Sequence, residues 1–255
     1  MTPIFIVFII LIGLVIGSFL NCLIWRLYKD ESMGGRSYCP KCHHQIDWYD
    51  NIPVLSFILL KGKCRHCKRK ISWQYPIVEI VTPILFLLTF LNDINSAQLS
   101  LLLIRDWLIV ATLIIVFVYD FRWQLVPMTI IWPMSAVIFI LNIFLGVSWL
   151  TLIISGAAAA AFFLAQYLIT KKKGLGTGDI WLGLMLGLTF PSFGQLFLIL
   201  ILAYSLGAFI GITLMIVKKE SGKTKIALGP FLALGAIITL IWGQSILAWY
   251  MSLFY

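Results

Sequence analysis

The chain is 255 residues long; 61% of its residues are hydrophobic, only 11% are charged, and the formal net charge is +9. This composition excludes a soluble globular domain, because long apolar runs between short charged loops are typical of a polytopic helical membrane protein. The runs are continuous and do not alternate, which excludes a transmembrane β-barrel. We therefore predict an all-α, membrane-embedded fold.

The first apolar run covers Pro3–Trp25 and has no basic residue before it. The positive charges follow it, from Arg26 onwards, and no small-residue cleavage site is evident. We therefore interpret this run as a retained first span with its N-terminus outside, and not as a signal peptide.

Seven further apolar runs bring the prediction to about eight transmembrane segments. In chain order they are Tyr75–Leu91, Gln98–Tyr119, Met128–Leu145, Ser148–Ile169, Ile180–Phe190, Ser192–Val217 and Gly229–Phe254. With the N-terminus outside, the predicted inside loops hold 18 of the 19 Lys and Arg residues, as the positive-inside rule requires. These loops are Arg26–Gln74, Asp120–Pro127, Thr170–Asp179 and Lys218–Leu228.

The segment Ile180–Phe190 is shorter than the roughly 20 residues that a helix needs to cross the hydrocarbon. If it did not cross, the lysines of Lys218–Leu228 would lie outside, so the charges favour a crossing with local thinning of the bilayer. We expect a first span (1–25), a cytosolic loop (26–74) and a multi-span membrane domain (75–255). Membrane lipid is an expected partner, and nucleic acid is not.

Four of the five cysteines lie in the predicted cytosolic loop as two C-x-x-C pairs, Cys39 with Cys42 and Cys64 with Cys67. Two such pairs can supply the four thiolates of a closed, tetrahedral zinc site. A closed site would fold a loop too small to hold itself together, and its thiols indicate a reducing compartment. We expect nearby Lys and Arg side chains to help keep the thiols deprotonated, namely those of Lys41, Lys63, Arg65, Lys68 and Arg69.

Other roles for these residues remain open from the sequence. The four cysteines could be unpaired or redox-active, and His43, His44 or His66 could replace a thiolate, although adjacent surface histidines are the simpler interpretation. Cys22 lies inside the first span, and we interpret it as a buried packing residue.

Four of the ten acidic residues lie in or at the edge of the predicted membrane: Glu79, Asp106, Asp120 and Asp179. Ionisable groups at that depth are costly and are candidates for a functional role. Asp106 has a simple partner in its neighbour Arg105, and Glu79 could reach the inner interface. Asp120 and Asp179 differ, because both lie at predicted cytosolic ends of spans.

Each of these two aspartates alone has a structural explanation, since Asp179 could cap a helix and Asp120 could begin a turn. Together, two carboxylates at one depth suggest a pair in which one carboxyl is kept neutral by the charge of the other and by desolvation. The ionised member can draw a proton from water while the neutral member donates one to a carbonyl oxygen. This is the chemistry of aspartic peptidases.

The stretch "GLGTGD", Gly174–Asp179, delivers the second aspartate. It is not a nucleotide-binding loop, because lysines precede it and its sixth residue would repel phosphate. Glycines at Gly174, Gly176 and Gly178 allow positive φ angles and leave space beside the carboxylate. We expect this loop to position an extended peptide against Asp179.

These motifs resemble, in order along nearly the whole chain, those of the bacterial type IV prepilin peptidases, membrane aspartic peptidases with a G-x-G-D motif. "GSFLNCLIWRL" at Gly17–Leu27 is similar to the opening signature of the family, and "GPFLALGA" at Gly229–Ala236 to the start of its last span. "CPKCHHQIDWYDNIPVLSF", "CRHC" and "ISWQYPIVE" resemble its zinc loop. "DFRWQLVP" and "GLGTGD" correspond to its two catalytic motifs, and the resemblance makes Asp120 and Asp179 the catalytic residues.

The resemblance implies that the chain removes the short basic leader of prepilins and pseudopilins, after a glycine, at the cytosolic face of the bacterial inner membrane. Such substrates serve pili, competence or secretion. Many members then methylate the new N-terminal residue with S-adenosylmethionine, and here that activity is implied by the family alone. Three positions depart from the family pattern: Trp181 replaces a lysine, Met128 an acidic or amide residue, and Gln74 an arginine.

Two hypotheses from other classes can be distinguished from a peptidase. A transporter would place its carboxylates near the bilayer midplane, whereas this pair is expected at the inner edge. An assembly protein, in which the zinc loop and the aspartates serve only folding, would tolerate asparagine at Asp120 or Asp179.

Overall fold

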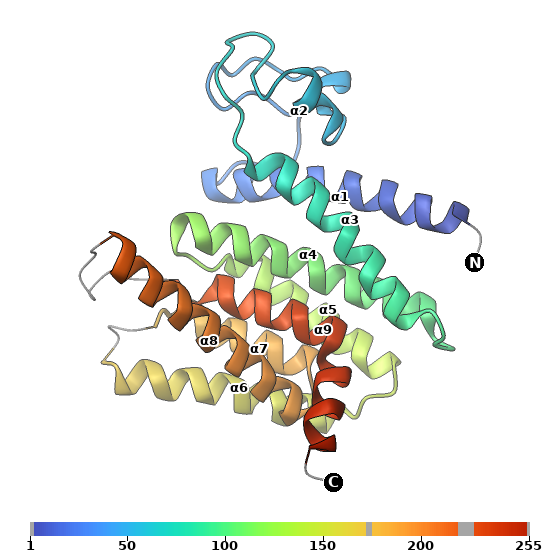
Figure 1. The fold of residues 1–255 in the computed structure, drawn as a ribbon, viewed down its shortest axis with the longest axis vertical. Coiled ribbons are helices and arrows are strands. Elements are labelled where there is room, and N and C mark those ends of the chain that lie inside the picture. Colours follow the sequence, from blue (N-terminus) through green and yellow to red (C-terminus); the bar gives the residue numbers. More distant parts are fainter. Residues whose placement is uncertain (1–2, 172–174, 219–226, 254–255) are drawn as a thin grey trace. The chain divides into compact units, whose positions relative to one another are not determined.

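The computed structural model describes residues 3–171, 175–218 and 227–253. Within these ranges all named elements are helices, and the only β-pairing is two isolated bridges in the cysteine loop, which confirms the all-α prediction (Figure 1). It divides into two compact units, Met1–Leu91 and Asn92–Tyr255. The functional division predicted from the sequence, with a loop over 26–74 and a membrane domain over 75–255, stays a prediction.

Each of the eight predicted apolar segments forms one helix, and the bounds agree to within a few residues. The helices are α1 (Pro3–Lys29), α3 (Gln74–Asp93), α4 (Leu99–Trp123), α5 (Met128–Phe144), α6 (Trp149–Ile169), α7 (Thr177–Thr189), α8 (Phe193–Lys218) and α9 (Gly229–Ser252). Six of them, all but α5 and α7, are long and apolar enough to cross a membrane. The chain is therefore a multi-pass membrane protein, and the count of eight spans is approximate.

In the first unit, α1 packs against α3 at positions where α1 carries glycine and therefore has no side chain. A Cβ atom on Gly13 would lie within 3 Å of the Pro83 backbone, and one on Gly17 would lie 2.9 Å from Glu79 Cα. The cysteine loop follows α1 and contains two short helices, η1 (Trp48–Asn51) and α2 (Leu55–Leu59). In lipid no hydrophobic driving force holds two helices together. The glycines at the contact of α1 with α3 therefore matter because they let the two backbones approach closely.

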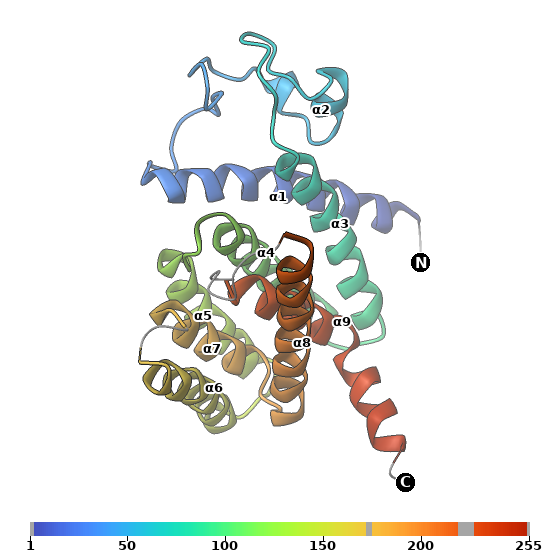
Figure 2. The ribbon, with the colours of Figure 1, turned by 60° about the vertical axis from the view of Figure 1, so that its left-hand side comes forward.

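The second unit is a bundle of α4 to α9, in which α7 packs chiefly against α6 and α5 (Figure 2). With 13 residues, α7 is about 20 Å long, well short of the hydrocarbon thickness of about 30 Å. Most of its residues from Asp179 to Thr189 are buried. The short helix is therefore surrounded by protein over most of its length.

The C-terminal end of α7 finds hydrogen-bond donors on neighbouring helices. Asn142 of α5 donates from Nδ2 to the Leu188 carbonyl at 2.8 Å, and the Ser155 hydroxyl of α6 donates to the Pro191 carbonyl at 2.9 Å. Free carbonyls at a helix end are costly in a membrane unless protein groups satisfy them. These two side chains therefore let the chain turn inside the bundle.

Gly187 offers a test of how closely α7 packs on α6. A Cβ there would lie 2.4 Å from the Ser155 carbonyl oxygen, whereas a Cβ on Gly194 would meet its nearest atoms at 3.5 Å. We expect Gly187→Ala to destabilise the protein by about 1–3 kcal/mol through overpacking, and the control Gly194→Ala to change little. Thermal unfolding in detergent measures both; equal melting temperatures for Gly187→Ala and wild type would contradict the packing.

Candidate active site

Asp120 lies near the C-terminal end of α4 and is only 5% exposed. The N-terminus of α9 meets it there, and the backbone N–H of Gly229 donates to its carboxylate. A Cβ atom on Gly229 would contact the same carboxylate, at 3.0 Å from Asp120 Cγ and closer still to Oδ2. Only glycine therefore allows the first turn of α9 to come this near.

Asp179 is the third residue of α7 and is 8% exposed. Its Oδ2 atom accepts a hydrogen bond from the Gly176 N–H at 3.0 Å, so the carboxylate does cap the helix, as the structural explanation proposed. Capping uses this one hydrogen bond and leaves the carboxylate at the first turn of α7. A capping role and a chemical role are therefore compatible.

The two aspartates are brought together by the connection between α4 and α5. Gln124 ends α4 in a left-handed conformation, and the chain then runs to Val126, which packs against Gly178 in the first turn of α7. Asp120 and Asp179 lie within the range over which the charge of one acts on the other. Two buried carboxylates from separate helices thus come within electrostatic range of each other.

The described glycines of "GLGTGD" do not have the backbone angles that the sequence led us to expect. Gly174 lies outside the described residues. Gly176 has a φ of −84°, and Gly178 is helical, so the predicted positive φ angles are wrong at both positions. At Gly178 the space is filled, because a Cβ there would lie 2.7 Å from Val126, while Gly176 is exposed and has only ordinary contacts.

Both carboxylates face the N-terminal end of a helix. Asp179 sits in the first turn of α7, and Asp120 accepts from the first residue of α9. A helix N-terminus carries a partial positive charge and free N–H groups, so both helix ends stabilise negative charge at the pair. Such a site can hold an ionised carboxylate beside a second carboxyl group.

The three departures from the family pattern are accommodated by local packing. The ring of Trp181 packs at a tilt against Trp132 of α5, with ring centroids 4.2 Å apart. The Met128 side chain lies next to Gly178. Gln74 donates from Nε2 to Asn21 Oδ1 at 3.1 Å in the first unit. Aromatic, apolar and amide contacts thus occupy these three positions.

The four cysteines of the loop converge on one point. The sulfur atoms of Cys39, Cys42, Cys64 and Cys67 all lie within 4.8 Å of one another, and those of Cys39 and Cys67 are 4.0 Å apart. A tetrahedral zinc site with Zn–S bonds of about 2.3 Å needs sulfur separations of about 3.8 Å. The four sulfurs therefore fit a metal ion of this kind.

The two C-x-x-C segments have the same backbone pattern. The carbonyl of Cys39 accepts from the His43 N–H at 2.9 Å, and that of Cys64 from the Lys68 N–H at 3.0 Å. His43 and Lys68 both have positive φ angles, of 57° and 56°. Each segment is thus one tight turn that aims two thiols at the same centre.

The pKa values of two of the four thiols are displaced in opposite directions. Burial raises the pKa of Cys64, but the N–H groups of Cys67 and His66 outweigh it and lower that pKa to about 7. The His44 N–H lowers the pKa of Cys42, but desolvation and the neighbouring thiols outweigh it and raise that pKa to about 11. Four thiolates therefore need a metal ion to balance their charge.

One expectation about the surroundings of this cluster changes. Arg65 was expected to help the thiols ionise, but its guanidinium binds Asp50 through two hydrogen bonds of 2.6 and 2.7 Å. Arg65 thereby holds the pKa of Asp50 below its usual range, and it ties η1 to the second cysteine pair. Among the described residues the metal-binding group contains no histidine; instead the rings of His44 and His66 contact each other.

Glu79 has a structural role that the sequence did not reveal. Its Oε2 atom accepts from the Val54 N–H at 2.7 Å, in the middle of the cysteine loop. Val54 has a φ of 62°, a strained angle for a β-branched residue, and Leu55 closes a tight turn with the Pro53 carbonyl at 2.6 Å. The buried carboxylate thus fixes this turn of the loop onto α3.

The remaining predictions about single residues can be checked directly. Asp106 accepts from Arg105 Nε at 2.6 Å, which confirms the simple explanation of its charge. Cys22 is only half-buried in α1, so its description as a buried packing residue was partly wrong. Gly229 is a site residue that sequence reasoning missed; the glycine–proline pair at the start of α9 was the available signal.

The chain matches the sequence models of two protein families. Residues 11–92 match the "Bacterial Peptidase A24 N-terminal domain", and residues 107–212 match the "Type IV leader peptidase family". A prepilin leader peptidase/N-methyltransferase of Aeromonas hydrophila is 32% identical over 96% of this chain and 93% of that protein. The chain belongs to the type IV leader peptidase family.

Other relatives of the same name support this membership. The protein of Pseudomonas putida is 32% identical over 98% of the chain and 94% of its own length, and that of Legionella pneumophila is 29% identical over 95% and 93%. The four cysteines lie in the first matched region, and both aspartates lie in the second. No solved structure matches the chain.

The close approach of Gly229 to Asp120 can be tested by a double-mutant cycle. We expect Gly229→Ala to lower the melting temperature, because the new methyl group would clash with the carboxylate. In an Asp120→Ala background the same change should cost much less, since the clashing group is gone. An equal loss in both backgrounds would show that the methyl group clashes with something else.

Proposed function

We propose that this protein is an aspartic endopeptidase that removes the short leader of prepilins and pseudopilins at the cytosolic face of the bacterial inner membrane. The observation that carries the proposal is the buried pair Asp120 and Asp179, held by two helix N-termini in the region that matches the leader peptidase family. The substrate is expected to have a basic leader followed by an apolar helix. The relatives, which are prepilin leader peptidases, support this class of substrate.

In the proposed reaction one carboxylate takes a proton from water while the other carboxyl group donates a proton to the scissile carbonyl oxygen. The water oxygen bonds to the carbonyl carbon and forms a tetrahedral intermediate. The carbon–nitrogen bond then breaks as the amine takes up a proton, and the carboxyl pair returns to its starting state. The N–H groups of Gly176 and Gly229 orient the two carboxylates throughout.

We assign the cluster of Cys39, Cys42, Cys64 and Cys67 to one structural zinc ion. Four thiolates leave no open position for substrate, so the metal stabilises the loop and takes no part in cleavage. The bidentate Arg65–Asp50 pair and the Glu79–Val54 hydrogen bond tie other parts of the loop. The fold of the loop is thus expected to depend on the metal site together with these two contacts.

The zinc assignment predicts a defined metal content. We expect elemental mass spectrometry of the purified protein to find about one zinc ion per chain. Cys39→Ser or Cys67→Ser should lose it, whereas Cys22→Ser should keep it, because Cys22 lies outside the cluster. A full complement of zinc in the Cys67→Ser variant would contradict a four-cysteine site.

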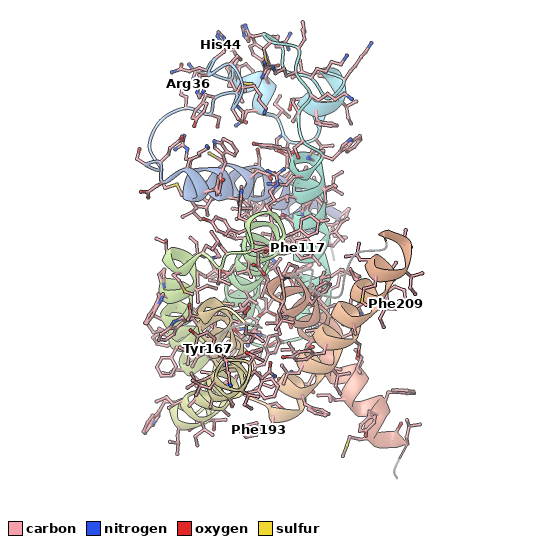
Figure 3. All side chains as sticks on the ribbon, turned by 90° about the vertical axis from the view of Figure 1, so that its left-hand side faces the viewer. Arg36, His44, Phe117, Tyr167, Phe193 and Phe209 are labelled. Atoms are coloured by element: carbon pink, nitrogen blue, oxygen red, sulfur yellow. The ribbon has the colours of Figure 1, made fainter. Side chains whose placement is uncertain are left out.

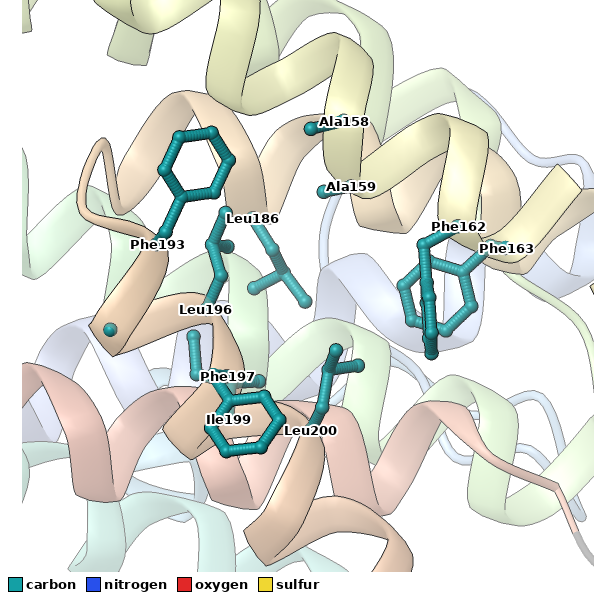
Figure 4. Close-up of a pocket in the computed structure, with 11 residues that line it drawn as sticks. Ala158, Ala159, Phe162, Phe163, Leu186, Phe193, Leu196, Phe197, Ile199 and Leu200 are labelled. Atoms are coloured by element: carbon teal, nitrogen blue, oxygen red, sulfur yellow. The ribbon is translucent and has the colours of Figure 1, made fainter. Parts of the chain in front are cut away.

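We also propose that the protein methylates the new N-terminus with S-adenosylmethionine, which its likeness to relatives named as N-methyltransferases supports. A cavity of about 490 Å³ between α6, α7 and α8 is not its site, because the lining is apolar (Figure 4). The sulfonium and carboxylate of S-adenosylmethionine require polar partners. S-adenosylmethionine would supply the methyl group, and no step of the transfer is assigned to residues here.

The test of the peptidase is cleavage of a prepilin in liposomes by Asp120→Asn and Asp179→Asn. Asparagine keeps the shape and can still be oriented by a backbone N–H, but it cannot carry the proton. We expect each variant to lose at least about 10³-fold in rate, as expected where a general acid–base group is removed. Asp30→Asn, at an exposed position in the first unit, is the control and should cleave normally.

Both variants must remain folded and inserted, which their melting temperatures report. Cleavage that survives in either variant would reduce that aspartate to a helix cap or a turn residue. That outcome would favour the assembly-protein hypothesis, and the aspartic mechanism would fall.

A further inference from the structure

An apolar cavity in the second unit lies between α6, α7 and α8. Its walls are Ala158, Ala159 and Phe162 on α6 and Phe193, Phe197 and Leu200 on α8, with Leu186 of α7 at its floor (Figure 4). No polar side chain lines it. The exposed flank of Phe197, at 64%, shows that the cavity opens to the outside of the bundle.

Along α8 the apolar face that lines the cavity is followed by a polar residue. On α8 its residues Phe193, Phe197 and Leu200 recur at spacings of four and three, and Tyr204 follows four residues later on the same face. Tyr204 lies about 6 Å along the helix from Leu200. Its hydroxyl donates to Gln166 Oε1 of α6 at 2.7 Å and thereby joins the two walls.

On α7 the cavity residue Leu186 lies seven residues from Asp179, about 10 Å away along the same face of the helix. The cavity and the Tyr204–Gln166 bridge therefore lie in order along the bundle toward the end that carries Asp179. The apolar cavity is followed by the polar Tyr204–Gln166 bridge. This surface therefore suits a ligand with an apolar segment followed by a polar one.

The size of the groove sets what it can hold. A volume of about 490 Å³ takes the side chains of one face of a helix but not a whole helix, whose diameter is about 10–12 Å. The small residues Ala158, Ala159 and Gly194 let a partner backbone approach closely. An amphipathic or apolar helix binds such a groove through residues spaced i, i+3, i+4 and i+7.

We propose that the groove between α6 and α8 docks the apolar helix of the prepilin substrate, with its N-terminal end at the Tyr204–Gln166 bridge. This inference rests on the proposed peptidase function and names the route by which the scissile bond reaches Asp179. The order of the cavity and the bridge toward Asp179 favours a substrate helix over a lipid acyl chain, which would have no need of a path to that residue. The helix enters from the lipid and leaves the same way.

Photo-crosslinking with matched positions tests the location. Phe197 and Phe209 are both exposed phenylalanines of α8, at 64% and 71%, and they point about 120° apart around the helix. Phe209 lies toward the other end of α8 from Phe193 (Figure 3). With p-benzoylphenylalanine at each position in turn, in an Asp120→Asn background that keeps the substrate intact, we expect crosslinks to prepilin from 197 and few from 209.

A kinetic test uses neighbouring alanines of α6. Ala158→Trp fills the groove, whereas Ala157→Trp adds the same ring at an exposed position about 100° away that does not line it. We expect Ala158→Trp to raise KM for full-length prepilin by about tenfold, equivalent to one lost contact, and Ala157→Trp to leave KM unchanged. A leader peptide that lacks the apolar helix should be cleaved equally by both.

The outcomes separate this inference from the proposed function. If wild type cleaves neither substrate, the peptidase assignment fails. If wild type cleaves but 197 crosslinks only to lipid, or Ala158→Trp leaves KM for prepilin unchanged, the enzyme stands and the docking site is wrong. Crosslinks between two copies of the chain from 197 would also overturn it and would assign the groove to self-association.

Discussion

The second unit depends on hydrogen bonds that satisfy both ends of one short helix inside the protein. Helix α7 is too short to cross the hydrocarbon alone, so with its start at the predicted inner edge its other end falls where water is scarce and free backbone groups are costly. At its start Asp179 accepts the Gly176 N–H, and at its end Asn142 and Ser155 donate to carbonyl groups. Without these hydrogen bonds α7 would be destabilised, and Asp179 would no longer be held in position.

The same constraint explains why the aspartate and the glycines occur together. A carboxylate in the first turn stabilises the helix dipole, and glycine at 178 lets that turn press against Val126. The connection that holds Val126 begins just after Asp120, so packing of the turn also sets the position of the other carboxylate. Stability and chemistry thus use the same contacts, and a substitution at either aspartate is expected to touch both.

Much of this architecture was predictable from the sequence. Hydrophobic runs gave all eight helices, because a helix in lipid must be apolar along its length, and two C-x-x-C pairs predicted the four-cysteine cluster. The depth of Asp120 and Asp179 followed from the positive-inside rule, and the structure brings their charges within interaction range. In each case a local pattern carries the information.

Contacts between distant segments were not predictable. The partnership of Glu79 with Val54 joins residues 25 apart in sequence, and that of Asp120 with Gly229 joins α4 to α9. Arg65 was expected to act on the thiols through its charge, but a carboxylate on η1 binds it first. The glycines of "GLGTGD" were expected to supply unusual backbone angles, whereas Gly178 serves to remove a side chain at a contact. Sequence gives the residue type, and packing decides which of its properties is used.

The central claim is that two carboxyl groups share one catalytic proton, and the pH dependence of kcat/KM tests it most directly. Prepilin cleavage in liposomes should give a bell-shaped profile, falling at low pH when both groups are protonated and at high pH when both are ionised. The two apparent pKa values belong to the pair. A rate that rises steadily with pH, or that does not change across the range in which the protein stays folded, would contradict the shared-proton mechanism.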